Sequence, residues 1–401
     1  MADARLFFRK YSEIYTVFLP LFSVFLVIYT GLIMFSSRHP GLPTDESDTL
    51  LYLHRSLISI PSVTTNEHAA AQFLQTYLTS KGWVVETQRV SSEPVRENIY
   101  AYRGSKRSTR VLFSSHIDTV PPFIQYSVHN GYIWGRGSVD AKASVAAQIT
   151  AAQDLLSSSD VADEGDISLL FVVGEETDGI GMITANELGL SWETVIFGEP
   201  TELKLAVGHK GLILGDLYAT GKASHSGYPE LGINANYYLV EGLYKLQNLD
   251  YPYSDLLGNT TFNAGMLEGG VAANVIPASA SASVAVRVAA DLDGVLSQMQ
   301  RAALGVPHLD INFTLSYPPV LCDYDVPGFD TVAVAYGTDI PHLEGSHKRY
   351  LYGPGSILFA HADNERISEK ELRDSVEGYK KLAAAALGNK HDMASDGKGA
   401  R

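Results

Sequence analysis

Acidic residues and histidines follow several apolar, strand-like stretches of this 401-residue chain. One such stretch, Val111 to Val120, contains His116 and Asp118, whose side chains a strand would point the same way because its period is two. Further residues of this kind, at the ends of apolar runs or beside glycines, are Asp140, Glu175, Glu176, Glu199 and His361. A charge in such a place is expensive to desolvate without a partner, and a bound metal ion would supply that partner. The pattern therefore predicts a metal site.

Strands alternate with helices in the part of the chain that carries these residues. Residues 83–90, 98–104 and 109–118 are expected as strands, and residues 50–60 and 65–80 as helices, with Thr65 as a plausible cap. Asp140 opens another helical stretch. This alternation predicts an α/β fold, with a mixed and mostly parallel sheet flanked by helices and ligands at the carboxyl ends of its strands.

The pattern changes near Gly208, where strands and helices follow in β-α-β-β-α-β order. This order predicts a smaller inserted α+β domain of the ferredoxin-like type, after which the chain returns to the first domain and ends it with a helix. The expected organisation is a cytosolic tail (1–13), a transmembrane signal-anchor (14–35), a linker (36–49), a catalytic domain in two parts (50–207 and 319–388), the inserted lid or dimerisation domain (208–318) and a disordered tail (389–401).

Composition excludes several classes of protein. The net charge of −15 and the lack of a basic stripe argue against a nucleic-acid partner. The one cysteine, Cys322, cannot form an intramolecular disulfide or a Cys-x-x-Cys metal site.

The amino-terminal region carries a membrane signal. Ile14 to Phe35 contains no charged residue and would span about 33 Å as a helix at roughly 1.5 Å per residue. Basic residues before it place the amino terminus in the cytosol and the catalytic domain in a lumenal, vacuolar or extracellular compartment. The sequons at Asn259 and Asn312 fit this secretory route. The alternative is a cleaved signal peptide and a secreted protein.

The chain resembles a family of co-catalytic zinc hydrolases that includes carboxypeptidase G, acetylornithine deacetylase, succinyl-diaminopimelate desuccinylase and aminoacylase, and within it the fungal probable secreted carboxypeptidases. The resemblance covers about residues 50–387 and rests on seven motifs in order, SHIDTVPP, GRGSVDAK, GEETDG, GEPT, KASHSGYP, GGVAANVIP and YGPGSILFAHADN.

The resemblance implies a role for each residue that matches a motif. It implies two zinc ions per chain, one held by His116 and Glu199 and the other by Glu176 and His361, with Asp140 bridging both. It further implies that Asp118 orients His116, that Glu175 is the general base and that His225 polarises the scissile carbonyl. Substrate would be bound by Arg287, Asn274, Gly353 and Gly355.

The chemistry of these residues agrees with that assignment. Two zinc ions about 3.5 to 4 Å apart need a bridging carboxylate, terminal carboxylate and imidazole ligands, and an open position for water. A carboxylate one residue from a ligand, as Glu175 is from Glu176, can take the proton of that water.

The expected function is hydrolysis of an amide next to a free carboxylate, most simply by a carboxypeptidase acting on peptides. Deacylation of N-acyl amino acids is the alternative, since it uses the same atoms with a different acyl pocket. A catalytically inactive membrane-bound binding protein is a third reading, and a homodimer through the inserted domain is possible. The sequence leaves the side-chain preference open.

Overall fold

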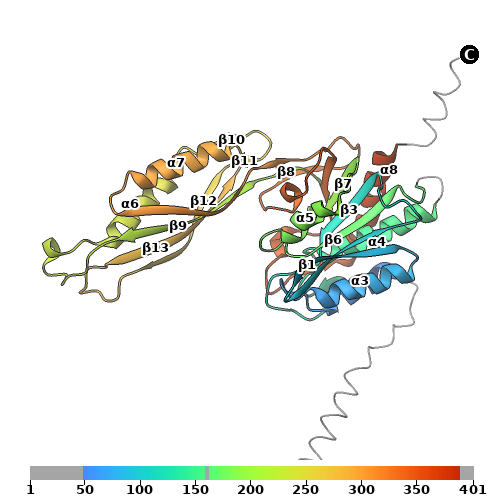
Figure 1. The fold of residues 1–401 in the computed structure, drawn as a ribbon, viewed down its shortest axis with the longest axis horizontal. Coiled ribbons are helices and arrows are strands. Elements are labelled where there is room, and N and C mark those ends of the chain that lie inside the picture. The colour runs from blue at the N-terminus through green and yellow to red at the C-terminus, as the bar shows by residue number, and fades with distance from the viewer. Residues whose placement is uncertain (1–47, 159–161, 389–401) are drawn as a thin grey trace, which may run out of the picture. The chain divides into compact units, whose positions relative to one another are not determined.

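The computed structural model describes residues 48–158 and 162–388 (Figure 1). The expected tail, anchor and most of the linker at the amino terminus, and the carboxyl-terminal tail, lie outside these residues. No helix within the described ranges is long and apolar enough to cross a membrane. Contacts group the chain from Leu50 onward into one compact unit, so the boundaries of the inserted domain stay predictions.

A six-stranded mixed sheet lies at the centre of the catalytic part of the chain. Its strand order is β1 (Val84–Ser92), β2 (Val95–Tyr102), β6 (Ile167–Val172), β3 (Val111–His116), β7 (Thr194–Gly198) and β17 (Lys348–Tyr352). The pairs β6–β3, β3–β7 and β7–β17 are parallel, whereas β1–β2 and β2–β6 are antiparallel. The predicted α/β fold with a mixed sheet is confirmed.

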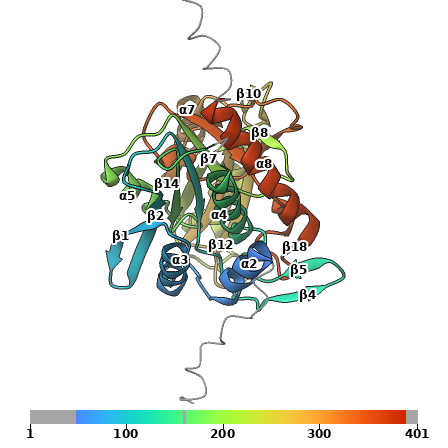
Figure 2. The ribbon, with the colours of Figure 1, turned by 90° about the vertical axis from the view of Figure 1, so that its right-hand side faces the viewer.

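Every residue of β3, β6 and β7 is buried, because helices or small sheets cover both faces of the large sheet. Alternate residues therefore enter different cores. Phe113 packs in a core with residues of α2 (Thr49–Ser59), α3 (His68–Ser80), α4 (Lys142–Ser157) and α8 (Glu369–Leu387), as Figure 2 shows for the helices. Leu112 packs on the other face with residues of α5 (Ile180–Ala185) and β8 (Leu205–His209).

Two small three-stranded sheets complete this part of the molecule. One has the order β15 (Val320–Leu321), β8 and β16 (Thr331–Val334), and the other has the order β18 (Arg366–Ser368), β5 (Tyr132–Trp134) and β4 (Ser127–His129). Short 3-10 helices among the described residues are η1 (Asn186–Leu188), η3 (Ile340–His342) and η4 (Ile357–Phe359) in this part and η2 (Pro229–Leu231) in the insertion.

The insertion has its own antiparallel sheet. Along the chain it contains β9 (Gly211–Thr220), α6 (Ala235–Gln247), the two-stranded hairpin β10 (Tyr253–Ser254) and β11 (Gly258–Asn259), β12 (Thr261–Gly269), β13 (Ser279–Val288), α7 (Leu292–Leu304) and β14 (Leu309–Tyr317). The sheet order β12-β13-β9-β14 places the first and third main strands in the middle, as a ferredoxin-like arrangement requires. Residues of both helices share one core with the sheet.

A side-chain cap begins some of the helices. Asn234 caps α6 by accepting a hydrogen bond from the amide of Asn236, and Ser368 caps α8 in the same way. The expectation that Thr65 caps α3 is wrong. Thr65 has a φ of 81°, and the helix begins only at His68. Glu67, the residue before the helix, makes no capping hydrogen bond with its side chain; its carboxylate accepts hydrogen bonds from Arg96.

Candidate metal centre

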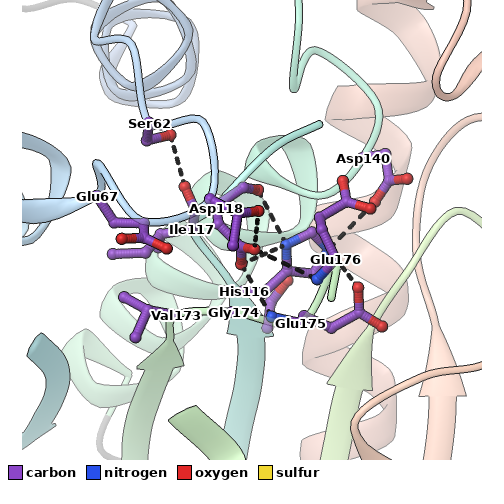
Figure 3. Close-up of polar contacts among 12 residues, drawn as sticks. Ser62, Glu67, His116, Ile117, Asp118, Asp140, Val173, Gly174, Glu175 and Glu176 are labelled. Atoms are coloured by element: carbon purple, nitrogen blue, oxygen red, sulfur yellow. Dashed lines mark hydrogen bonds and ion pairs between the residues drawn. The ribbon is translucent and has the colours of Figure 1, made fainter. Parts of the chain in front are cut away.

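The carboxyl ends of three parallel strands bring the acidic residues to one place. His116 is the last residue of β3, Glu199 follows β7 directly, and Glu175 and Glu176 follow β6 after a turn at Gly174. Since parallel strands end at the same edge of the sheet, residues far apart in sequence become neighbours there (Figure 3). The two remaining predicted ligands come from loops. Asp140 lies just before α4, and His361 lies in a turn after η4.

Asp140 stands between the two histidines. Its Oδ1 is 3.1 Å from Nε2 of His116, and its Oδ2 is 3.2 Å from Nε2 of His361. The other carboxylates complete each side, with Glu199 Oε1 3.6 Å from His116 Nε2 and Glu176 Oε2 2.9 Å from His361 Nε2. One oxygen of a single carboxylate thus faces each histidine, which is the arrangement that a bridging ligand needs.

The side chains offer ligand atoms close enough to share an ion. Among the described residues, His116, Asp140 and Glu176 form one group whose ligand atoms all lie within 4.8 Å, and His116, Glu175 and Glu199 form another. Imidazole nitrogens and carboxylate oxygens are the donors that zinc accepts in hydrolytic sites. By distance alone, Glu175 could serve either as a metal ligand or as a general base.

Unbalanced negative charge accumulates at this site. Burial raises the pKa of Glu199 and of Glu175 well above the usual range, and neighbouring carboxylates add to the effect. Burial lowers the pKa of His116, but Glu199, Asp118 and Asp140 outweigh burial and raise that pKa well above its usual range. These side chains would need protons to be stable together, and divalent cations can replace those protons.

Asp118 connects the histidine to the acidic turn. Its Oδ1 lies 3.4 Å from Nδ1 of His116, and its carbonyl oxygen lies 3.1 Å from the same nitrogen. The carboxylate also accepts hydrogen bonds from the amides of Glu175 and Glu176 and from the hydroxyl of Thr64. It is therefore placed to hold the imidazole with Nε2 toward Asp140, as Figure 3 shows.

A cavity of about 200 Å³ extends from the metal ligands to Arg287. Glu175 lines it together with Glu176 and His361. Other parts of the wall are apolar or aromatic and come from β9, β14 and the segment before η3, namely Leu212, Leu315, Tyr317 and Tyr336. The structure thus places Arg287 in the same cavity as the candidate base.

His225 and Asn274 do not line this cavity. They lie beside each other on the insertion, where the amide of Ser226 donates to the carbonyl of Asn274 at 3.0 Å and His225 pairs with Val275. The ring of His225 accepts a hydrogen bond from the amide of Gly227. Contact of either side chain with substrate stays a prediction.

Gly353 and Gly355 have close neighbours that explain their residue type. A Cβ atom on Gly353 would lie 2.4 Å from the carbonyl oxygen of Glu199, and one on Gly355, whose φ is 76°, would lie 2.3 Å from Val139. Neither glycine lines the cavity beside Glu175. Gly353 thus allows the loop to pack against the ligand Glu199, and Gly355 allows it to pack against Val139 beside Asp140. Contact of either glycine with substrate stays a prediction.

Sequence reasoning missed several residues of the site. Asp339 lines the cavity with only 6% of its surface exposed, and burial raises its pKa to about 8. Arg136 and Glu365 form a buried ion pair behind Asp140. The sequence signal for these residues is weak. Asp339 lies two residues after Gly337, and Glu365 lies four residues after the predicted ligand His361. Nothing in this spacing shows where the side chains point.

Comparisons with known proteins find peptidases among the relatives of this chain. A family model described as a peptidase dimerisation domain matches residues 207–304, and one described as peptidase family M28 matches residues 98–192. A peptidase M20 domain-containing protein of Schizosaccharomyces pombe is 52% identical over 338 residues, which cover 84% of each chain. A probable carboxypeptidase of Aspergillus flavus is 44% identical over 384 residues, covering 85% of this chain and 91% of its own.

Solved structures share the fold at low sequence identity. A tripeptidase of Staphylococcus aureus superposes with a TM-score of 0.70 at 20% identity, over 84% of this chain and 98% of the other. An M20 family metallo-carboxypeptidase of Sulfolobus solfataricus superposes with a TM-score of 0.65 at 16% identity, over 85% of this chain and 99% of the other. With the close relatives, the fold and the paired histidine and carboxylate side chains, the conclusion is that the chain belongs to the M20 peptidase family.

Proposed function

We propose that the protein is a carboxypeptidase that hydrolyses the last peptide bond of its substrate with the help of two zinc ions. The observation that carries the proposal is the position of Asp140 between His116 and His361, with Glu175 beside them and Arg287 in the same cavity. Relatives named as probable carboxypeptidases support the peptide substrate. The donor set supports zinc, and the choice of this metal is part of the proposal.

The residues divide the reaction between them. Bound zinc ions would polarise the scissile carbonyl and lower the pKa of the attacking water. Glu175, whose carboxylate lies 3.8 Å from Nε2 of His116, would accept a proton from the attacking water and return it to the leaving amine. Arg287 holds the terminal carboxylate through two parallel hydrogen bonds, which sets the distance from that carboxylate to the bond that is cleaved.

Two other functions are alternatives to a carboxypeptidase. A deacylase for N-acyl amino acids would use the same ligands and the same arginine, and would differ in the substrate on the acyl side. An inactive binding protein would need no base, yet the carboxylate of Glu175 lies 3.8 Å from His116 among the ligands. The geometry therefore favours an enzyme over a binding protein.

A homodimer through the insertion is part of the proposal. Tyr237, Val240 and Tyr244 are exposed on α6 at positions i, i+3 and i+7, which share one face of a helix. β12 is an edge strand and carries exposed Met266 and Leu267. Exposed aromatic and aliphatic side chains of this kind mark protein interfaces, and an unpaired strand edge can extend a sheet across two copies.

We also propose that residues 14–35 anchor the protein in a secretory membrane, with the catalytic domain on the lumenal side. The length and apolar composition of that segment support the anchor. Asn259 and Asn312 are both exposed on the insertion, so each sequon is accessible to glycosylation.

The first prediction tests the bridging ligand. Asp140→Ala removes the carboxylate that both ions share, so we expect loss of both zinc ions, measured as metal per chain after gel filtration. Asp154→Ala, which removes an aspartate from the exposed surface of α4, should retain two ions. Two zinc ions in Asp140→Ala would contradict the bridge.

The second prediction tests the base. Glu175→Gln keeps the size of the side chain and removes its ability to accept a proton, so we expect near-normal zinc content and a kcat about 10² to 10⁴ times lower. Glu187→Gln, outside the cavity, is the control. Undiminished turnover by Glu175→Gln would rule out this role.

The third prediction separates a carboxypeptidase from a general amidase. Peptides with a free terminal carboxylate should be cleaved far faster than their amides, and Arg287→Lys should lose about 2 kcal/mol or more in kcat/KM on the free acids alone, because an ammonium cannot form the paired hydrogen bonds. Arg301→Lys on α7 is the matched control. A parallel series of N-acyl amino acids decides between peptidase and deacylase. A wild type indifferent to amidation would exclude both.

The fourth prediction concerns topology. The full-length protein should remain with membranes after alkaline carbonate extraction, and a glycosidase should shift its mobility unless both Asn259→Gln and Asn312→Gln are present. A glycosylated soluble product that begins near Ser36 would instead establish the cleaved signal. A soluble, full-length and unglycosylated chain would contradict the secretory route.

The fifth prediction concerns the oligomer. The soluble part of the chain, residues 43–401, should sediment as a dimer, and Val240→Glu together with Tyr244→Glu should convert it to a monomer because the charges would be buried without partners. Tyr253→Glu, exposed on β10, should leave the dimer unchanged. A monomeric parent protein would refute the proposed interface.

A further inference from the structure

The two ligands on loops lack the support that the strands give to the others. His116 ends β3 and Glu199 follows β7, and these strands are hydrogen-bonded neighbours in the central sheet. Asp140 and His361 belong to separate loops, and His361 has a φ of 61°, which is uncommon for a residue with a side chain. Something other than the sheet must therefore hold Asp140 Oδ2 and His361 Nε2 at 3.2 Å.

A buried ion pair lies behind these two loops. Arg136 and Glu365 are 2% and 1% exposed, and Nη1 of the arginine is 2.6 Å from Oε2 of the glutamate. The other carboxylate oxygen, Oε1, accepts hydrogen bonds from the backbone amides of Val139 at 3.2 Å and Asp140 at 3.3 Å. Glu365 thus holds the backbone of the bridging ligand directly.

The arginine extends the same chain of contacts to the histidine loop. Its guanidinium donates to the carbonyl oxygen of Ala362, the residue after His361, and to that of Pro122. The amide of Glu365 donates to Ala362 as well, and the amide of Gly135 donates to the carbonyl of Glu365. The contacts therefore form a closed path from the amide of Asp140 through two charged side chains to the residue beside His361.

Stability alone gives little reason for such a pair. Removing two charges from water costs several kcal/mol per ion, and well-packed apolar side chains of similar size often replace a buried pair without loss of stability. Apolar side chains could not, however, accept hydrogen bonds from the two backbone amides on one side or donate a hydrogen bond to the carbonyl oxygen on the other. What the pair supplies beyond packing is a fixed separation between the two loops.

We propose that Arg136 and Glu365 are positioning residues that set the distance between Asp140 and His361 and thereby determine the affinity of the second metal site, formed by Glu176, His361 and Asp140. The first site, formed by His116, Glu199 and Asp140, depends on them less because two of its ligands are fixed at strand ends. The inference rests on the proposed function in requiring that two ions bind.

The test compares wild type with the double variant Arg136→Met and Glu365→Met, which keeps the side-chain volume and removes both charges. Each metal-free soluble chain is titrated with zinc in competition with a chromophoric chelator. We expect the first zinc equivalent to bind within about threefold of wild type and the second to bind about 10 to 100 times more weakly. The metal-free variant should stay folded but melt at a lower temperature than wild type, because the amides of Val139 and Asp140 and the carbonyl of Ala362 lose their side-chain partners. The control combines Arg107→Met and Glu86→Met, a pair at 2.8 Å that joins β1 to the loop before β3 and contacts no ligand, and it should bind both ions normally.

Each other result overturns the proposal. Normal affinity at both sites would show that the pair does not position the second site, and equal weakening of both sites in a folded variant would show a general structural role. If the double variant does not fold, Glu365→Asp replaces it, since this change keeps the charge and shortens the side chain by one methylene. It should weaken binding of the second zinc ion alone. An unchanged affinity for the second zinc ion would refute the inference. A wild type that binds fewer than two ions would refute the proposed function itself before any variant is compared.

Discussion

The repulsion among buried carboxylates at the ends of β3, β6 and β7 is the constraint on which the rest of the site depends. Glu175, Glu176 and Glu199 all have raised pKa values, with burial as the largest cause and neighbouring acids adding to it. The two histidines compensate only part of this charge. A folded chain gains nothing in stability from such a cluster, so the cost is explained by the cations that the cluster can bind.

The arrangement of the fold follows from placing that charge at one edge of a buried sheet. Phe113 and Leu112 alternate into two separate cores, which fixes the register of β3 and so the direction of the His116 side chain at its end. Parallel pairing with β6 and β7 brings the acidic turns to the same edge. The large apolar core is thus the rigid support that a metal site needs if its ligands are to stay within a few tenths of an ångström.

The sequence was sufficient to predict the α/β alternation, the mixed sheet and the residues near its carboxyl edge, because period, length and turn residues are local signals. It was insufficient for Asp339, Arg136 and Glu365, since the burial and direction of a polar side chain depend on loops brought together by the whole fold. The wrong cap at Thr65 has the same origin. Thr65 is a good capping residue by local criteria, but the helix begins after Glu67, whose carboxylate pairs with Arg96 and joins the start of α3 to β2.

Support for the metal centre also comes from α2, at the start of the described chain. The buried side chain of Lys142 donates to the carbonyl oxygen of Leu57, in the last turn of that helix, and to that of Ile60 just after it. Burial lowers the pKa of Lys142 to about 7, a cost that apolar packing alone would not impose. The hydroxyl of Ser62 binds the carbonyl of Ile117, next to His116, as Figure 3 shows. Nε2 of His54 in α2 lies 2.9 Å from the carbonyl oxygen of Ser138, two residues before Asp140, and Ser62 follows the helix closely. A segment that contributes no ligand itself therefore packs against the chain beside both Asp140 and His116.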